Sequence, residues 1–368
     1  MSQLITIHYE GKPIYPIVIE KDYSHLAKIL ADMDLQNHKI CIVTDSHVAP
    51  HYASEVLEIA KQVASYAMTF TFPAGEQSKT LDVIEDLYEE LIMAHFDRKD
   101  ILLALGGGVV GDMTGYAAAN YLRGIRVVQL PTSLLAMVDS SIGGKTGVDF
   151  RGYKNMIGAF HQPSAVYMNL STLQTLTEEQ FFSGFGEIIK HGLIKDMQYF
   201  NLIVKNLDEL NRRNLDVLEE VVSGSCQIKR QVVENDPKEQ GERALLNFGH
   251  TLGHAIEKLM DFQMLHGACV SVGMVAAAYL SVQRGYITQK QFDQIKETLQ
   301  TLQLPIQVSG LQAEDILRVS KSDKKMNAGQ IRFILLESMG HAIMCDDVTD
   351  DEILQALDVV LCFPSETK

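Results

Sequence analysis

Four short apolar runs in the first half of the chain alternate with segments of helical spacing, and this alternation constrains the fold most strongly. The segments with helical spacing are residues 52–63 and 79–95. The apolar runs, each short enough to be a buried strand, are residues 38–45, 64–72, 100–108 and 125–131. Strands that alternate with helices along a chain form a largely parallel sheet. We therefore predict an α/β N-terminal domain with a mostly parallel, Rossmann-like sheet over residues 1–175.

The second half of the chain has a different pattern. Between residues 177 and 320 strand-like runs almost vanish, and amphipathic helical segments follow one another. We predict an all-α C-terminal domain over residues 176–368. No long polar linker separates the two domains, so we expect them to abut, with the active site in the cleft between them.

Composition restricts the partners of the chain. A formal net charge of −15 at pH 7 argues against broad binding to nucleic acid or to anionic membranes. An anionic small molecule would therefore need a few local lysines and arginines. The five cysteines are scattered and form no C-x-x-C pair, and no run reaches the roughly 18 apolar residues of a membrane span. With no signal-peptide pattern at the N-terminus, we expect a soluble cytoplasmic protein with reduced thiols.

Three consecutive glycines follow the third apolar run, in "LALGGGVVGDMTGYAA" (residues 103–118). Glycines between a strand and a helix let backbone amides approach a phosphate at the helix N-terminus. The order G-G-G-x-x-G-D differs from the usual G-x-G-x-x-G fingerprint. The segment is equally typical of a dinucleotide-binding loop and of a plain tight turn.

A second glycine-rich segment, residues 139–160, concentrates Asp139, Lys145, Lys154 and Asn155 in an otherwise acidic chain. A solvated hairpin with ordinary surface lysines would have the same pattern. The apolar surroundings favour an anion-binding site instead.

Helical spacing places Glu187, Lys190 and His191 on one face of the segment 184–196. A surface ion pair would explain the first two residues. The surrounding isoleucines and leucine indicate a buried helix, however, and buried charges need partners. A buried glutamate beside a buried lysine is a candidate functional site.

Two histidines four residues apart, His250 and His254, lie on one face of a predicted helix. Arg243 and Asn247 continue the same stripe upstream, and Lys229 precedes them. Such a histidine pair is often only an exposed helix face. It lacks the glutamate of an H-E-x-x-H metalloprotease.

A third histidine, His266, begins the next apolar segment. With Glu187 and His250 it offers one carboxylate and two imidazoles, a ligand set that holds catalytic zinc with an open position. On spacing alone, His254 could replace either histidine. Later in the chain, Lys324 and Lys325 precede a strand-like run.

Eight motifs occur in an order that is similar to one enzyme family. They are "PAGEQSK", "GGGVVGDMTGYAAANYLRG", "QLPTSLLAMVDSSIGGKTGVD", "YKNMIGAF", "GFGEIIKHG", "NFGHTLGHAIE", "LHGACVSVGM" and "DKKMNAGQIRF". Over roughly residues 40 to 340 the chain resembles the 3-dehydroquinate synthases of the shikimate pathway. The resemblance implies an NAD-binding domain, a helical metal- and substrate-binding domain and, usually, a homodimer.

The resemblance also implies a reaction. It converts 3-deoxy-D-arabino-heptulosonate 7-phosphate, a phosphorylated sugar acid, to 3-dehydroquinate and phosphate. NAD oxidises a ring hydroxyl to a ketone, which acidifies the adjacent C–H so that phosphate can be eliminated. The ketone is then reduced again, the ring opens, and an intramolecular aldol step closes the carbocycle.

Site residues follow from the resemblance by position. The implied metal ligands, for zinc or cobalt, are Glu187, His250 and His266, while His254 is an active-site residue. The implied catalytic residues near the reacting hydroxyls are Asp139, Lys145, Lys190 and Lys229. The implied carboxylate clamp is Lys229 with Arg243. The implied phosphate pocket is Lys145, Lys154, Asn155, Asn247, one of Lys324 and Lys325, and Arg123 of the neighbouring subunit. The implied NAD-binding residues are Asp45, Glu76, Lys79, Gly107, Gly108, Asp112, Thr132, Ser133, Lys145, Lys154, Thr175 and Glu179.

Two positions depart from the family pattern. His191 stands where the family often has tyrosine, and Ala268 stands where glutamate often follows "LHG". Neither is an implied ligand.

Three other functions are compatible with parts of the sequence. A metal-dependent NAD polyol or alcohol dehydrogenase would need the metal and NAD but no anion-binding lysines. A sugar-phosphate cyclase for a substrate without a carboxylate would have little use for both Lys229 and Arg243. A catalytically silent metabolite-binding regulator would not need zinc, NAD and phosphate contacts together.

Overall fold

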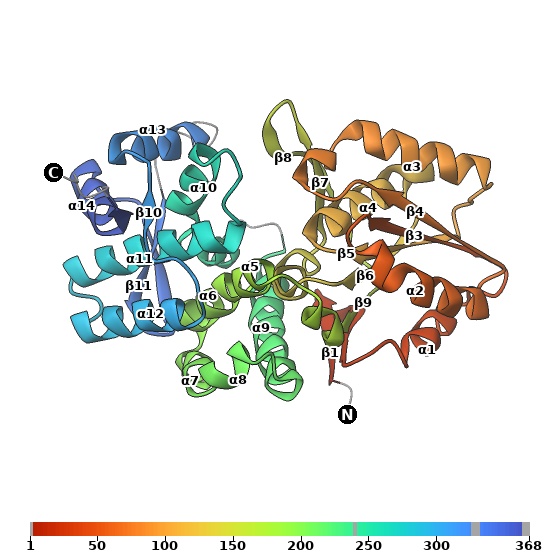
Figure 1. The fold of residues 1–368 in the computed structure, drawn as a ribbon, viewed down its shortest axis with the longest axis horizontal. Coiled ribbons are helices and arrows are strands. Elements are labelled where there is room, and N and C mark those ends of the chain that lie inside the picture. The colour runs from red at the N-terminus through yellow and green to blue at the C-terminus, as the bar shows by residue number, and fades with distance from the viewer. Residues whose placement is uncertain (1–2, 238–240, 325–331, 363–368) are drawn as a thin grey trace. The chain divides into compact units, whose positions relative to one another are not determined.

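The computed structural model describes residues 3–237, 241–324 and 332–362 (Figure 1). The chain divides into two compact units, Met1–Leu176 and Thr177–Lys368. Each unit buries a large set of its own apolar side chains.

A seven-stranded sheet forms the centre of the first unit, with the order β1-β2-β9-β6-β5-β3-β4. Only β1 pairs in antiparallel fashion, with β2, and the other pairings are parallel. This confirms the predicted mostly parallel sheet. The four predicted runs correspond to four of its strands. The strands are β1 (Gln3–Tyr9), β2 (Lys12–Glu20), β3 (Lys39–Asp45), β4 (Tyr66–Phe72), β5 (Ile101–Gly106), β6 (Arg126–Pro131) and β9 (Ala165–Asn169).

Helices cover both faces of this sheet (Figure 1). On β3, Cys41 and Val43 belong to the core that includes α3 (Leu81–Met93) and α4 (Gly108–Asn120). Ile40 and Ile42 face the opposite core, which includes α1 (Leu26–Ala31) and α2 (Ala49–Val63). This alternation is why β3 is apolar at nearly every position, as expected for a strand buried on both faces.

The parallel strands reverse their order of connection at one point of the sheet. From β3 the chain runs to its neighbour β4 and then crosses back to β5 on the other side of β3. In open α/β sheets, ligands bind beyond the carboxyl ends of the strands at such a switch point. The remaining elements of this unit are η1 (Glu76–Ser78), η2 (Tyr121–Arg123), η3 (Ala136–Ser140), η4 (Leu170–Gln174), and the antiparallel hairpin of β7 (Lys145–Phe150) and β8 (Tyr153–Phe160).

The second unit is mainly helical, as predicted. Its helices are α5 (Glu178–Ser183), α6 (Phe185–Lys195), α7 (Met197–Lys205), α8 (Leu207–Asn211), α9 (Leu215–Asn235), η5 (Glu242–Asn247), α10 (His250–Leu259), α11 (His266–Gln283), α12 (Gln289–Thr301), α13 (Ala313–Lys324) and α14 (Asp350–Val360). The unit also contains two pairs of short strands, which the all-helical prediction lacked. They are β10 (Val308–Ser309) with β13 (Leu361–Cys362), and β11 (Phe333–Ser338) with β12 (His341–Cys345).

Helix α11 is the central helix of this unit. It is apolar on all sides, and by length and hydropathy it would pass as a membrane span, but most of it is buried inside the unit. Such a burial pattern is that of a core helix. Glycines let α10 approach it closely: a Cβ on Gly273 would lie 1.9 Å from the carbonyl oxygen of Gly249.

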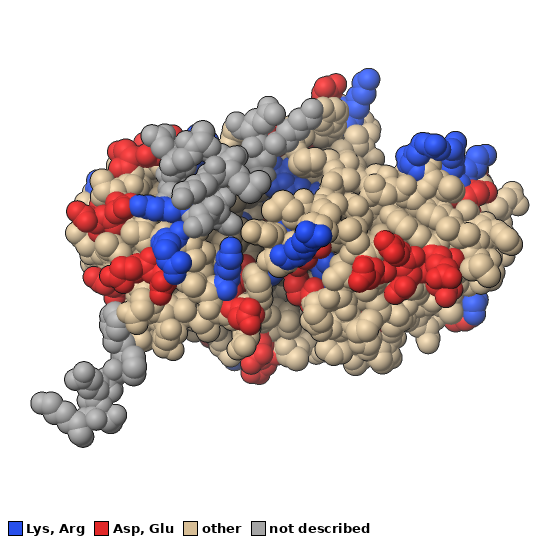
Figure 2. Space-filling model, turned by 90° about the horizontal axis from the view of Figure 1, so that it is seen from above, with Lys and Arg blue, Asp and Glu red and all other residues tan. Residues whose placement is uncertain are grey.

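Surface charges are mixed. On the face drawn in Figure 2, basic side chains are interspersed with acidic ones and do not merge into one basic surface.

Candidate functional site

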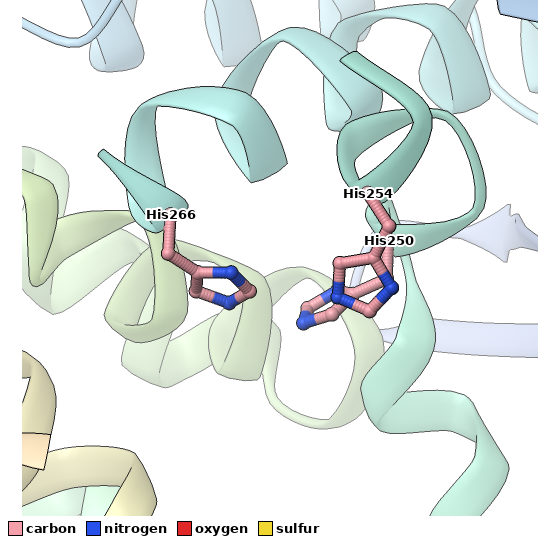
Figure 3. A group of neighbouring side chains, drawn as sticks. All are labelled: His250, His254 and His266. Carbon is pink, nitrogen blue, oxygen red and sulfur yellow. The ribbon is translucent and has the colours of Figure 1, made fainter. Parts of the chain in front are cut away.

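Three histidines converge in the second unit (Figure 3). His250 and His254 lie in the first turns of α10, and His266 is the first residue of α11. One ring nitrogen from each lies within 4.8 Å of the others. The cluster forms because α10 and α11 pack together with their N-termini close to each other.

The predicted continuous stripe from Arg243 to His254 is wrong. Arg243 and Asn247 belong to η5, and Gly249 then breaks the helix with a left-handed φ of +79° before α10 begins. Glycine is required at position 249 for two reasons. A Cβ would lie 2.8 Å from the backbone nitrogen of Met274, and any other residue would have to adopt a disfavoured left-handed φ. Arg243 and His250 are therefore placed by two separate elements.

Glu187 supplies a carboxylate to the histidine cluster from α6. Its side chain is fully buried, and its Oε1 lies 3.4 Å from His250 Nε2 and 3.7 Å from His266 Nε2. Within the described residues, Oε1 is a buried oxygen that makes no hydrogen bond. Two ligands of one tetrahedral zinc ion lie about 3.3–3.6 Å apart, given zinc–ligand bonds of ~2.0–2.2 Å. The spacing and the unsatisfied oxygen both fit a metal ion among these three side chains.

Neighbouring groups orient the two imidazoles. His250 Nδ1 lies 3.1 Å from the carbonyl oxygen of Phe248, and His266 Nδ1 lies 3.6 Å from Glu257 Oε2. Metal-binding histidines usually have such a partner on the far nitrogen, which fixes the tautomer and the direction of the ring. Both Nε2 atoms are thereby left to face Glu187.

The protonation states of the cluster also suit a cation. Burial opposes ionisation of Glu187, but Lys190 and the two histidines lower its pKa well below the ordinary value. Burial and the Lys190 charge lower the pKa of His250. Burial opposes the protonation of His266, yet Glu187 and Glu257 raise its pKa to about 9. A bound metal would displace that proton.

His254 remains the alternative ligand. It is exposed, and its ring centroid lies 5.1 Å from that of His250 and 5.7 Å from that of His266. The assignment of three of these four side chains as ligands stays a prediction.

Buried cations lie on the elements around the cluster. Lys190 Nζ pairs with Glu187 Oε2, and both groups are buried, as predicted for α6. Lys229 on α9 and Arg243 on η5 are also buried, and α6, α9 and η5 contact one another. The Arg243 guanidinium donates to the carbonyl oxygen of Pro237 at 2.9 Å.

Two further predicted residues lie at the ends of elements. Asn247 is the last residue of η5 and is half-buried, and Lys324 is the last residue of α13. Lys325 lies outside the described residues.

The predicted NAD-binding residues of the first unit gather at the carboxyl edge of its sheet. Asp45 ends β3, Gly107 and Gly108 follow β5, and Thr132 and Ser133 follow β6. Of these strands, β3 and β5 border the switch point. Gly107 is the N-cap of α4, so the free backbone amides of that helix start at this edge, where a phosphate would bind.

Two of the predicted residues also have clear structural contacts. Asp45 Oδ1 accepts the backbone N–H groups of His47 and Val48 at 2.8 and 3.0 Å. Thr175 Oγ1 lies 2.5 Å from the Tyr52 hydroxyl of α2. Glu179 lies on α5, in the second unit.

A buried lysine connects three elements at the same edge. Lys79 Nζ donates to Asp112 Oδ2 on α4 at 2.7 Å and to Asn155 Oδ1 on β8 at 2.6 Å. Burial opposes its charge, but Asp112 and Glu76 raise the pKa of Lys79, while burial raises that of Asp112. Nearby, Lys154 Nζ lies 3.6 Å from Glu76 Oε1. The structure thus brings together residues predicted for NAD and for the substrate phosphate.

Within the segment 139–160, residues 145–160 form the antiparallel β7–β8 hairpin, and the anion-binding interpretation stays a prediction. Asp139 lies half-buried in η3, and Lys145 is exposed at the start of β7. Arg123 is exposed at the end of η2 with a φ of +70°.

Spacing arguments missed Glu257, the carboxylate behind His266. It lies three residues after His254 on the same helix, so the i, i+3 rule applied to α10 would have found it.

Comparisons with known proteins agree along the chain. Residues 69–183 match the model described as 3-dehydroquinate synthase N-terminal, and residues 184–326 match 3-dehydroquinate synthase C-terminal. The 3-dehydroquinate synthase of Acetivibrio thermocellus is 43% identical over 92% of this chain and 94% of its own length. That of Ruthia magnifica subsp. Calyptogena magnifica is 42% identical over 94% and 96%.

Solved structures share the fold. A 2-epi-5-epi-valiolone synthase from Streptomyces hygroscopicus subsp. jinggangensis, with NAD⁺ and Zn²⁺ bound, has a TM-score of 0.87 at 26% identity, over 98% of both chains. A 2-deoxy-scyllo-inosose synthase complexed with carbaglucose-6-phosphate, NAD⁺ and Co²⁺ has a TM-score of 0.84 at 22% identity, over 96% of this chain and 99% of its own. An iron-containing alcohol dehydrogenase is less similar, with a TM-score of 0.68 at 16% identity over 98% and 99%.

Proposed function

The chain belongs to the 3-dehydroquinate synthase family, and we propose that it converts 3-deoxy-D-arabino-heptulosonate 7-phosphate to 3-dehydroquinate and phosphate. The observation that carries the proposal is its identity of more than 40% with curated 3-dehydroquinate synthases over more than nine-tenths of both chains. The enzyme is a lyase that eliminates phosphate and closes a carbocycle.

NAD and a divalent metal, zinc or cobalt, are the cofactors of this reaction. When bound, NAD takes up and returns a hydride at one ring carbon, and the metal polarises the oxygen on that carbon. Glu187, His250 and His266 would hold the metal, which is supported by the unsatisfied Oε1 of Glu187. The glycines after β5 would hold the pyrophosphate of NAD, supported by their place at the N-terminus of α4.

The cationic side chains bind and orient the substrate. Lys229 and Arg243 would hold its carboxylate, and Lys145, Lys154, Asn155 and Asn247 would hold its phosphate. Lys190 would contact the hydroxyl groups while compensating the charge of Glu187. A substrate fixed at both ends keeps one pose through successive steps, so each step avoids the entropy of a new encounter.

A second candidate is a cyclase for a sugar phosphate without a carboxylate. The similarity to the 2-epi-5-epi-valiolone synthase structure favours it. Against it, this chain has both Lys229 and Arg243, buried on α9 and η5, and an ammonium beside a guanidinium is suited to holding a carboxylate. A dehydrogenase is less favoured, because the alcohol dehydrogenase structure is more distant.

We also propose a cytoplasmic homodimer in which Arg123 of one copy reaches the phosphate pocket of the other. In support, Arg123 and the preceding Leu122 both have left-handed backbones, and strained residues of this kind cluster at functional sites. All five cysteines are free thiols, which suits a reducing compartment.

Arg243→Lys tests the carboxylate clamp and so separates the two cyclases. Lysine keeps the charge but loses the planar, bidentate grip. With heptulosonate phosphate, kcat/KM should fall by a factor that corresponds to a loss of about 1–3 kcal/mol in transition-state binding. For a heptulose phosphate that lacks the carboxylate, kcat/KM should change little. An equal effect on both substrates would exclude the clamp. A wild-type preference for the substrate without the carboxylate would favour the second candidate.

A further inference from the structure

Asp149 connects the β7–β8 hairpin to the segment that carries Lys79. Its backbone N–H donates to the carbonyl oxygen of Lys79 at 2.8 Å, and its side-chain Oδ1 accepts the backbone N–H of Asn155 at 2.8 Å. Asp149 is not among the residues predicted to bind the metal, NAD or the substrate. It nevertheless contacts two residues that were predicted for two different ligands, NAD and the substrate phosphate.

The hairpin is irregular where Asp149 lies. Val148 pairs with Ile157, and Phe150 pairs with Tyr153. On β7 only Asp149 lies between these two pairs, whereas on β8 three residues do. Asn155, the middle one, has a left-handed φ of +51°. Irregularities of this kind re-aim a side chain and are frequent beside active sites. The left-handed region is uncommon for residues other than glycine, although asparagine enters it more readily than most, and the hydrogen bond from the Asn155 backbone to the Asp149 carboxylate stabilises it here.

The re-aimed side chain meets Lys79. An ammonium group only donates hydrogen bonds, so the Asn155 atom 2.6 Å from Lys79 Nζ must be the amide oxygen. The amide nitrogen is then the other branch of the group, and its two hydrogens are the ones that can donate to an anion. A phosphate accepts hydrogen bonds, so this orientation is the one that a phosphate site requires.

We propose that Asp149 is a positioning residue for the substrate phosphate. It holds the left-handed turn at Asn155, so that Lys79 fixes the amide oxygen and the amide nitrogen faces the phosphate. The inference rests on the proposed function, because that function supplies the phosphorylated substrate. The oxygen of Asp149 is what matters, and its charge is not required.

Four variants test this role with the zinc- and NAD-loaded enzyme. Asp149→Ala removes the acceptor, and we expect KM for heptulosonate phosphate to rise by up to about tenfold, as for loss of a hydrogen bond. KM for NAD and kcat should change less than KM for the substrate. Asp149→Asn keeps an acceptor oxygen and should restore KM. Asn155→Ala should raise KM at least as much. Asp86→Ala removes the same carboxylate from an exposed position on α3 and should change nothing.

The double variant Asp149→Ala/Asn155→Ala identifies the route of the effect. If Asp149 acts through Asn155, the double variant should have the KM of Asn155→Ala alone. The proposal would be overturned by an unchanged KM in Asp149→Ala, by an Asp149→Asn variant as impaired as Asp149→Ala, or by additive effects. A wild-type KM in Asn155→Ala would also overturn it, even if Asp149→Ala did not fold. A wild-type enzyme that releases no phosphate from heptulosonate phosphate would instead contradict the proposed function.

Discussion

Glu187 is a buried carboxylate with one oxygen paired to Lys190 and the other facing two imidazoles. A buried oxygen without a hydrogen bond costs about 1–3 kcal/mol, and more when it is charged. A metal ion held by that oxygen and by both Nε2 atoms, as proposed, would remove that cost. Under this proposal, the stability of the fold and the binding of the metal would be linked at Glu187.

Three variants of the cluster should differ in metal content. His266→Ala should lose stoichiometric zinc and activity while the fold survives, because it removes a ligand. Glu257→Gln should weaken zinc affinity by roughly 10- to 100-fold, as for an outer partner of a ligating histidine. His254→Ala should keep the metal and lose rate. Metal analysis with circular dichroism on the three proteins measures this. A His254→Ala protein without zinc, beside a His266→Ala protein with zinc, would reverse the ligand assignment.

Sequence patterns find residues of this site unequally well. Glu187 and Lys190 are identifiable because they interrupt an apolar helical face. Asp149 is not, because its importance comes from an irregular pairing between strands and from a lysine 70 residues earlier in the chain. The predicted continuous stripe from Arg243 to His254 was wrong for a related reason. Only the packing of Gly249 against Met274 reveals why the helix breaks there.

At the scale of elements, Arg284 ties the end of α11 to the start of α14. Its guanidinium donates to both oxygens of Glu352 at 2.9 and 3.1 Å. Glu352 also completes the capping box of α14 with Thr349. The hydrogen bonds from Arg284 are the main reason that the pKa of Glu352 falls from 4.5 to about 2.

This pair should make stability depend on pH. The folded-state pKa of Glu352 is depressed, so its contribution is complete above about pH 4.5 and is lost as the pH falls toward 2. Arg284→Ala should lower the free energy of unfolding by about 1 kcal/mol at pH 7, since both groups are partly solvated. The difference from wild type should shrink between pH 4.5 and 2 in urea titrations. Arg318→Ala, which removes an exposed i,i+3 pair with Asp315, is the control. A difference that stays constant across this range would contradict the role of the pair.

The first strands show which elements the sequence pattern missed. Residues 3–9 and 12–20 form the β1–β2 hairpin around Glu10 and Gly11, both with left-handed φ. A two-residue turn containing glycine between apolar alternations is a hairpin signal, so these strands were predictable. The pairing of β10 with β13 was not, because two-residue strands lack any pattern of their own.

At the scale of the whole molecule, the order of strands and helices identifies the two kinds of unit, because burial on both faces makes parallel strands continuously apolar. The eight motifs then identify the family, which the identity along nearly the whole chain confirms. What neither pattern supplies is the fixed orientation of side chains such as Asn155, which depends on contacts between residues far apart in sequence.

The reaction itself offers the most direct test, because the cyclase returns the hydride to the carbon that gave it up. Net oxidation is therefore zero, whereas a dehydrogenase releases one NADH for each substrate oxidised. The purified protein is supplied with zinc, a trace of NAD⁺ and heptulosonate phosphate, and phosphate release and NADH absorbance are followed together. We predict many equivalents of phosphate for each NAD⁺ and no growing NADH signal. Sustained NADH accumulation with a simple polyol, and no phosphate release from the sugar acid, would contradict the assignment.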